Sequence, residues 1–196
     1  MRVNCGKPLH CFQRGIVMKS KTKNTTHKIV FAALMAAITC VMTIAIRIPS
    51  PTGGYLNMGD VAVLTSCWLL GPLWGSLAAA SGSALADIFS GYFQYAPATF
   101  IIKGLMALLA WYIISLFGKD NKKTFVTLLG NLLAFILAEA LMVGLYFVFE
   151  ATVLQYGMGA AAGILGNTMQ GITGILGAII FTEILRRTKV KEKYIG

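Results

Sequence analysis

The run IVFAALMAAITCVMTIAI, from Ile29 to Ile46, decides what kind of fold this chain adopts. It holds 18 residues without a charged side chain, which is long enough to cross the hydrocarbon core of a bilayer as a helix. Arg47 and the breaker Pro49-Ser-Pro51 end the run. We therefore predict a membrane-spanning helix over residues 29–46, followed by a loop over residues 52–57.

Five more apolar segments follow this run, and each is bounded by turn-forming or charged residues. We expect them to form helices over residues 58–70, 73–89, 98–117, 125–149 and 158–185. Gly71-Pro72 separates the first two of these sharply. The helix over residues 73–89 carries small side chains on one face for close packing, namely Gly75, Ala79, Gly82, Ser83 and Ala86. The sequence thus predicts an all-α integral membrane protein, a bundle of six transmembrane helices over residues 27–186.

Composition supports a membrane protein and excludes a large soluble enzyme. The 196 residues are 57% hydrophobic and 12% charged, whereas a soluble domain is about 25% charged. The mean hydropathy is +0.72. Once the apolar segments are set aside, the remaining connections are too short to bury a core of their own. Any function must lie in the bundle or at its ends.

Charge predicts the topology. The formal net charge is +10, and most basic residues flank the bundle: Arg2, Lys7, Arg14, Lys19, Lys21, Lys23 and Lys28 before it, and Arg186, Arg187, Lys189, Lys191 and Lys193 after it. Both termini should therefore be cytoplasmic. Lys119, Lys122 and Lys123 fall in another inside connection, while the outside connections carry only Arg47.

The two basic tails, residues 1–26 and 187–196, should contact water and anionic lipid rather than nucleic acid. We expect the N-terminal tail to be disordered. Met18 opens a lysine-rich lead-in and is a candidate for the true start of the protein.

Motifs for catalysis are absent from the sequence. There is no G-x-x-x-x-G-K-[ST] phosphate loop and no H-E-x-x-H zinc motif. The residues before Asp60 do not form the Gly-x-Gly-Asp pattern of an intramembrane aspartyl protease. The cysteines, Cys5, Cys11, Cys40 and Cys67, have no paired spacing. We expect no catalytic residue, no metal site and no cofactor.

Polar residues within the spans point instead to a binding site, because ionisable groups in a membrane are costly and usually functional. With the predicted topology, the deepest of them lie about 8 to 18 Å below the outer helix ends at 1.5 Å per residue. Three outside loops add aromatic and amide groups. The candidate substrate-binding residues are Tyr55, Asn57, Asp60, Asp87, Tyr92, Gln94, Tyr95, Lys103, Glu139, Asn167 and Gln170. We expect an outward-facing polar cavity for a small, flat, polar solute.

Structural roles for the same residues stay open at this point. Lys103 and Glu139 could form a structural ion pair. Asp60 and Asp87 could cap helix ends. The two amides in the last helix could be hydrogen-bonding glue between helices, and the tyrosines could belong to an interfacial aromatic belt.

Four short stretches carry a resemblance to a known family. They are Phe31-Ala-Ala-Leu-Met-Ala-Ala-Ile38 with its overlapping Ala-x-x-x-Ala steps, Gly-Gly-Tyr-Leu-Asn-Met-Gly-Asp60, Leu-Leu-Gly-Pro-Leu-Trp-Gly75, and Ser-Ala-Leu-Ala-Asp-Ile-Phe-Ser-Gly-Tyr92. Together with six spans and basic termini, residues 27–186 resemble the substrate-binding S component of energy-coupling factor (ECF) vitamin transporters. The likeness is greatest to the branch for riboflavin, hydroxymethylpyrimidine and pyridoxine.

The resemblance implies a function that the residues alone do not give. It implies high-affinity binding of a vitamin or precursor from outside, and transport only with a membrane coupling protein and two ABC-type ATPases in a prokaryotic cell membrane. The docking face would be Ala32, Ala33, Ala36 and Ala37. We favour a small pyrimidine or pyridine precursor as the substrate. A long N-terminal extension is one departure from the family. A secondary transporter and a membrane enzyme acting on lipid are the alternatives.

Overall fold

The computed structural model describes residues 9–50, 54–118, 124–188 and 190, with side chains from residue 25 onward. These residues form six α-helices, one short hairpin and one 3-10 helix. In chain order the elements are α1 (Leu9–Ala45), β1 (Arg47–Pro49), β2 (Tyr55–Asn57), α2 (Gly59–Leu70), α3 (Pro72–Phe89), α4 (Ala96–Gly118), α5 (Thr124–Thr152), η1 (Gly157–Ala160) and α6 (Ala161–Arg187). The predicted helical bundle is therefore confirmed, with the hairpin as an addition.

Four segments within these helices are long and apolar enough to cross a membrane: Thr25–Ala45, Ala96–Phe117, Phe125–Thr152 and Gly157–Arg187. The chain is thus a multi-pass membrane protein. α2 is apolar but short, and α3 is rich in small residues. The prediction of six spans stays a prediction, as do the cytoplasmic positions of the two termini.

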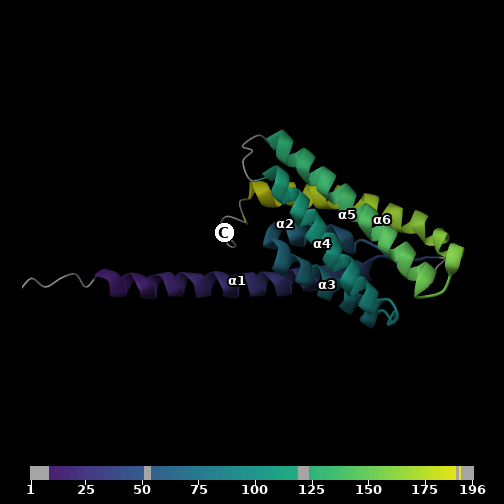
Figure 1. Cartoon of the computed structure of the whole chain (residues 1–196), viewed down its shortest axis with the longest axis horizontal. Helices are drawn as coiled ribbons and strands as arrows, with labels where there is room; N and C mark the ends of the chain where they lie inside the picture. The colour runs from purple at the N-terminus through teal and green to yellow at the C-terminus, as the bar shows by residue number, and fades with distance from the viewer. Residues whose placement is uncertain (1–8, 51–53, 119–123, 189, 191–196) are drawn as a thin grey trace, which may run out of the picture.

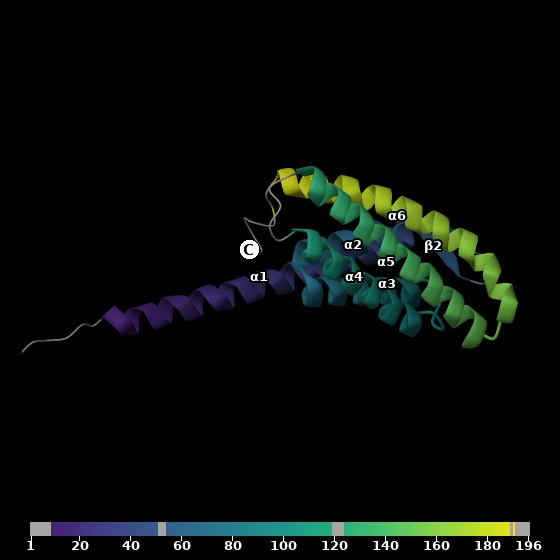
Figure 2. The same cartoon turned by 45° about the horizontal axis from the view of Figure 1, so that its top comes forward.

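The helices lie side by side, and their ends define two ends of the bundle (Figure 1). We call one of them the hairpin end, because β1 and β2 lie there with the α3–α4 and α5–η1 connections (Figures 1 and 2). The C-terminal end of α6 lies at the opposite end. The first part of α1 also projects from that end, beyond the other helices.

Three differences from the predicted elements bear on the site or on the chain outside the bundle. α1 begins at Leu9 rather than Ile29, since residues 18–28 are polar but contain no proline or glycine that would end a helix. β2 lies within the expected loop and pairs antiparallel with β1, with Ile48 opposite Leu56. α5 continues to Thr152, so Glu150 belongs to a helix rather than to a connection. Residues 119–123, the expected inside connection, and 1–8 of the expected tail lie outside the described residues.

The main core lies between α2, α4 and α5, with a contribution from α6. Its largest fully buried apolar side chains are Leu64, Met106, Phe135 and Met142. Close packing of such side chains fixes the rotation of each helix about its own axis, because a rotated helix would leave voids.

α1 packs against α3 at a point where only glycine fits. A Cβ atom at Gly82 would collide with the carbonyl oxygen of Ala36. Ala32, on the same face of α1, is 8% exposed and lies in an apolar cluster with Trp68 and Ala78. Small residues on both helices thus permit the close approach that the sequence predicts.

The four alanines of the expected docking face differ in exposure, and their docking role stays a prediction. Ala32 is buried and Ala36 is half-buried, both packed in the apolar cluster within the chain. Ala33 and Ala37 lie one residue further along each turn and are exposed. The four alanines therefore divide between two faces of the helix, since neighbouring residues point about 100° apart.

Candidate functional site

A small cavity at the hairpin end brings together polar side chains from five helices and the hairpin. Its volume is about 40 Å³, which is room for a few water molecules. A vitamin-sized ring therefore requires the walls to move apart. The lining residues are Thr43, Ser50, Gly54, Tyr55, Asn57, Ser83, Asp87, Tyr95, Thr99, Lys103, Tyr146, Glu150, Asn167 and Gln170.

An ion pair between α2 and α4 forms the floor of the cavity. Lys103 Nζ contacts Asp60 Oδ1, and both side chains are almost fully buried. The structure therefore contradicts the alternative in which Lys103 forms an ion pair with Glu139. Asp60 lies in the first turn of α2 but does not cap it, because its oxygens are engaged by side chains of other helices. Burial of an ion pair is tolerated only when such hydrogen bonds complete it.

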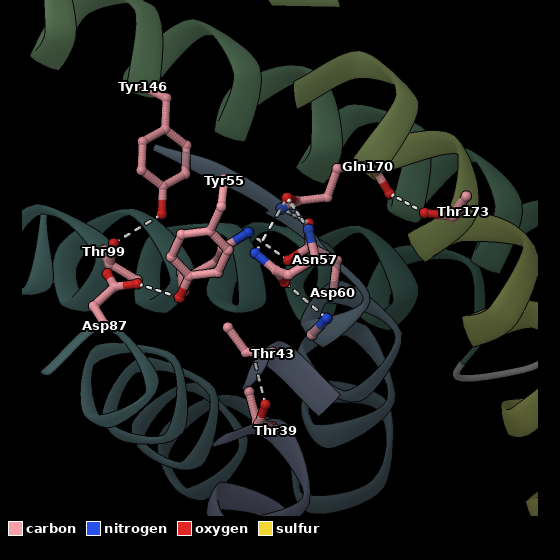
Figure 3. Close-up of polar contacts among 12 residues, drawn as sticks. Thr39, Thr43, Tyr55, Asn57, Asp60, Asp87, Thr99, Tyr146, Gln170 and Thr173 are labelled. Carbon is pink, nitrogen blue, oxygen red and sulfur yellow. Dashed lines mark hydrogen bonds and ion pairs between the residues drawn. The ribbon is translucent and has the colours of Figure 1, made fainter. Parts of the chain in front are cut away.

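Gln170 of α6 connects this floor to the hairpin. Its Nε2 donates to Asp60 Oδ2 at 2.6 Å, and its Oε1 accepts from the backbone N–H of Asn57 at 3.0 Å and from Asn57 Nδ2 at 3.2 Å. Asn57 Oδ1 in turn accepts from the N–H of Gly59 at 2.8 Å, at the start of α2. Figure 3 shows Gln170, Asn57 and Asp60 meeting at this point. The amide therefore acts as glue between helices and also borders the cavity.

Asp87, near the carboxyl end of α3, forms part of the wall. Tyr55 Oη donates to its Oδ1 at 2.7 Å, and Figure 3 shows the phenol directed at the carboxylate. Burial and the negative charge of Asp87 raise the pKa of the Tyr55 phenol, so this group stays a protonated donor. The other carboxylate oxygen, Oδ2, is buried and accepts no hydrogen bond from the described residues.

Aromatic rings surround the mouth of the cavity. Tyr92 packs on Tyr55 with a centroid distance of 4.6 Å, and Tyr95 contacts Tyr92 edge-on at 6.4 Å. Tyr95 Oη donates to Glu150 Oε1 at 3.3 Å. The Tyr146 hydroxyl lies 2.9 Å from Thr99 Oγ1. Rings with hydroxyls anchored in this way offer fixed faces for stacking.

The predicted site residues divide into those that border the cavity and those that do not. The cavity is lined by Tyr55, Asn57, Asp87, Tyr95, Lys103, Asn167 and Gln170. Of the others, Asp60 lies beneath Lys103, Tyr92 supports Tyr55, and Gln94 is exposed to solvent.

Glu139 lies away from the cavity lining, packed against α6. A Cβ atom at Gly174 would lie 2.6 Å from its Oε1 and 2.8 Å from Asp60 Cβ, so the glycine makes room for both acidic side chains. Both carboxylate oxygens of Glu139 are buried without a hydrogen bond from the described residues. Glu139 borders a separate recess between α5 and α6, together with Gly171.

Several lining residues were not predicted from the sequence. They are Thr43, Ser50, Gly54, Ser83, Thr99, Tyr146 and Glu150. Glu150 could have been predicted from the sequence, because an acidic residue at the end of an apolar helix is costly and usually functional. In the structure Glu150 is 3% exposed. The hydroxyl residues could not have been predicted in this way, because serine and threonine are common in membrane helices and often bond only their own backbone.

A family model described as "ECF-type riboflavin transporter, S component" matches residues 23–187. The chain belongs to this family. As an S component it is a transporter subunit and not an enzyme.

Two relatives and one solved structure resemble this S component. An uncharacterized protein of Pyrococcus woesei is 36% identical over 137 residues, which cover 69% of this chain and 86% of that protein. The thiamine precursor transporter HmpT of Lactococcus lactis is 28% identical over 176 residues, which cover 88% and 96%. The S component of a bacterial ECF transporter of known structure aligns with a TM-score of 0.62 and 24% identity, covering 86% of this chain and 99% of that one. The structural likeness confirms the fold.

Proposed function

We propose that this S component is the high-affinity membrane binding subunit of an ECF-type importer for a small water-soluble vitamin or vitamin precursor. The observation that carries the proposal is the cavity at the hairpin end, where polar side chains from five helices and the hairpin converge in a chain of this family. A hydroxymethylpyrimidine- or pyridoxine-like compound is the favoured substrate, and riboflavin is the other candidate.

The substrate preference draws on the relatives and on the size of the site. HmpT is named as a thiamine precursor transporter, and the family model is named for riboflavin. A single small ring fits more readily than a three-ring system between walls that now enclose about 40 Å³. Stacking on Tyr55, Tyr95 or Tyr146 suits any flat ring.

Transport requires partners, because this sequence contains no phosphate loop that could hydrolyse ATP. The partners are a membrane coupling protein and two ABC-type ATPases. Ala33 and Ala37 support a docking role, since they are exposed on α1 and are flanked by exposed Ile29 and Val41 at the same four-residue spacing. A strip of small side chains allows another helix to approach closely.

The proposed topology has six spans, with both termini in the cytoplasm of a prokaryotic cell. α2 and α3 would form one inward and one outward pass, although each is shorter than the other four helices. The hairpin end would then face outward, where a vitamin first meets the cell. Cysteine accessibility from each side of the membrane, at positions 90 and 188, tests this orientation.

Binding and uptake assays test the function. The purified chain, without ATP, should bind one member of a vitamin panel with nanomolar affinity. In liposomes it should show saturable binding without accumulation, and the coupling protein with two ATPases should add ATP-dependent uptake. Concentrative uptake by the lone chain, driven by a proton or sodium gradient, would instead identify a secondary transporter. Turnover of a lipid without vitamin binding would identify an enzyme.

A further inference from the structure

The charges around the cavity do not balance. Asp87 and Glu150 line it, Lys103 is the cation among its described lining residues, and Asp60 lies directly beneath. These four side chains comprise three carboxylates and one ammonium group. The ammonium group is already paired with Asp60. In their ionised forms they leave the cavity wall with an excess of negative charge, carried by Asp87 and Glu150.

Asp87 has a position that the fold alone does not explain. It lies in the last turn of α3 (Pro72–Phe89), where the partial negative charge of the helix end disfavours an anion. It is 5% exposed, and burial of an incompletely bonded carboxylate is costly. Its Oδ1 is bound by Tyr55 and the Thr99 side chain also interacts with the carboxylate, while Oδ2 is buried without a hydrogen bond from the described residues. A ligand that brings a donor or a positive charge would offset these costs.

The aromatic lining is suited to the same kind of ligand. Tyr55, Tyr95 and Tyr146 all border the cavity, and the face of a tyrosine ring attracts cations as well as flat rings. Lys103 Nζ itself lies 5.6 Å from the centroid of the Tyr146 ring. A cationic aromatic ring could therefore stack and be neutralised at once.

We propose that the cavity selects an aromatic ring whose edge carries N–H donors and a positive charge, such as a protonated amino-substituted azine, with Asp87 Oδ2 as the anchoring acceptor. This rests on the proposed function, because it assumes that the cavity is the binding site. It predicts discrimination against anionic vitamins and against rings whose edge offers only acceptors. Lys103 then serves to position Asp60 and the cavity floor, rather than to bind an anionic ligand.

Calorimetric titration of the full-length chain with matched rings tests this inference. The probes are 4-amino-5-hydroxymethyl-2-methylpyrimidine, its 4-oxo counterpart of the same size, and riboflavin. The amino ring should bind about 10- to 100-fold more tightly than the oxo ring, as expected for a charge-assisted hydrogen bond. Asp87→Asn should reduce this ratio to within about threefold. Glu183→Gln, a matched change at the opposite end of α6, should leave the ratio unchanged.

The outcomes separate this inference from the proposed function. Equal or tighter binding of the oxo ring or of riboflavin would overturn the charge selection, while nanomolar binding of any vitamin would still support the S-component function. If no member of the vitamin panel bound, both the S-component function and the charge selection would be overturned. If Asp87→Asn does not fold, the ratio in the unmodified chain decides, and Glu150→Gln should lower it by a smaller factor. An unchanged ratio in both variants would remove the carboxylates as the cause.

Discussion

The two ends of the bundle differ in the chemistry of their buried side chains. The hairpin end buries Asp60, Lys103 and Gln170 in one hydrogen-bonded network, and Asp87 in a separate bond with Tyr55. The opposite end packs apolar side chains against one another, including Phe31, Trp68, Leu69, Trp74 and Leu185. Apolar side chains stabilise a fold by packing alone. A buried charged side chain destabilises the fold when one of its partners is removed. The difference supports the proposal that the hairpin end binds the ligand, while apolar packing stabilises the opposite end.

The largest effect should come from breaking the buried ion pair. Lys103→Met leaves Asp60 buried without its cation, and should lower the free energy of unfolding in detergent by about 3–5 kcal/mol. The double variant Lys103→Met with Asp60→Leu should recover part of this loss, because a buried apolar pair needs no counter-charge. A single variant as stable as the unmodified chain would show that the hairpin end does not depend on this pair.

A smaller effect should distinguish the two faces of α1. Ala36→Leu adds atoms beside Gly82 and should cost about 1–3 kcal/mol of stability through overpacking. Ala37→Leu adds the same atoms on the exposed face, and should change stability by less than about 0.5 kcal/mol. Under the proposed function, Ala37→Leu should still reduce uptake in the full complex while vitamin binding persists. Loss of binding in Ala37→Leu would contradict this assignment of faces.

Removal of a single hydroxyl group at the hairpin end should have a still smaller effect on stability and affinity. Tyr55→Phe removes the donor to Asp87 Oδ1 and should weaken both stability and vitamin affinity by about 0.5–1.5 kcal/mol each. Tyr112→Phe makes the same change on α4 at a position that is 56% exposed, and should alter neither. Thermal unfolding and calorimetric titration of the two variants give the comparison. Equal losses in both would mean that the phenol–carboxylate bond contributes nothing specific.

The smallest effect is expected at the opposite end of α6. Glu183 accepts hydrogen bonds from Arg186 at 2.8 and 3.0 Å and from Arg187 at 2.8 Å. These groups are partly exposed, so water and salt screen them. Glu183→Gln should leave vitamin affinity unchanged and shift the melting temperature only slightly at low salt, and not at high salt. A clear loss of affinity would show that the two ends are coupled.

Some of the site could be predicted from the sequence, and the reason differs from residue to residue. Asp87 and Lys103 were found because charge within an apolar helix is rare and costly. Tyr55 and Asn57 were predicted because they lie in an expected outside loop that offers aromatic and amide groups. Thr99 and Tyr146 were not found, because their types are ordinary in membrane helices and only their neighbours mark them.

The sequence by itself determined the class of this protein. Uncharged runs such as residues 29–46 must form helices in a bilayer, since no water is present to satisfy their backbone groups. It also determined the approximate helix boundaries through Gly71-Pro72 and the charged connections, and the stretches that identify the family.

Only the tertiary structure decided which side chains meet. The sequence allowed Lys103 to pair with Glu139, but the heights and rotations of α2, α4 and α5 place Asp60 at its ammonium group. In the same way, the contact at Gly82 decided which alanines of α1 are covered. Spacing along one helix fixes which residues share a face, whereas the rotation of that face toward a neighbour is set by packing against the whole bundle.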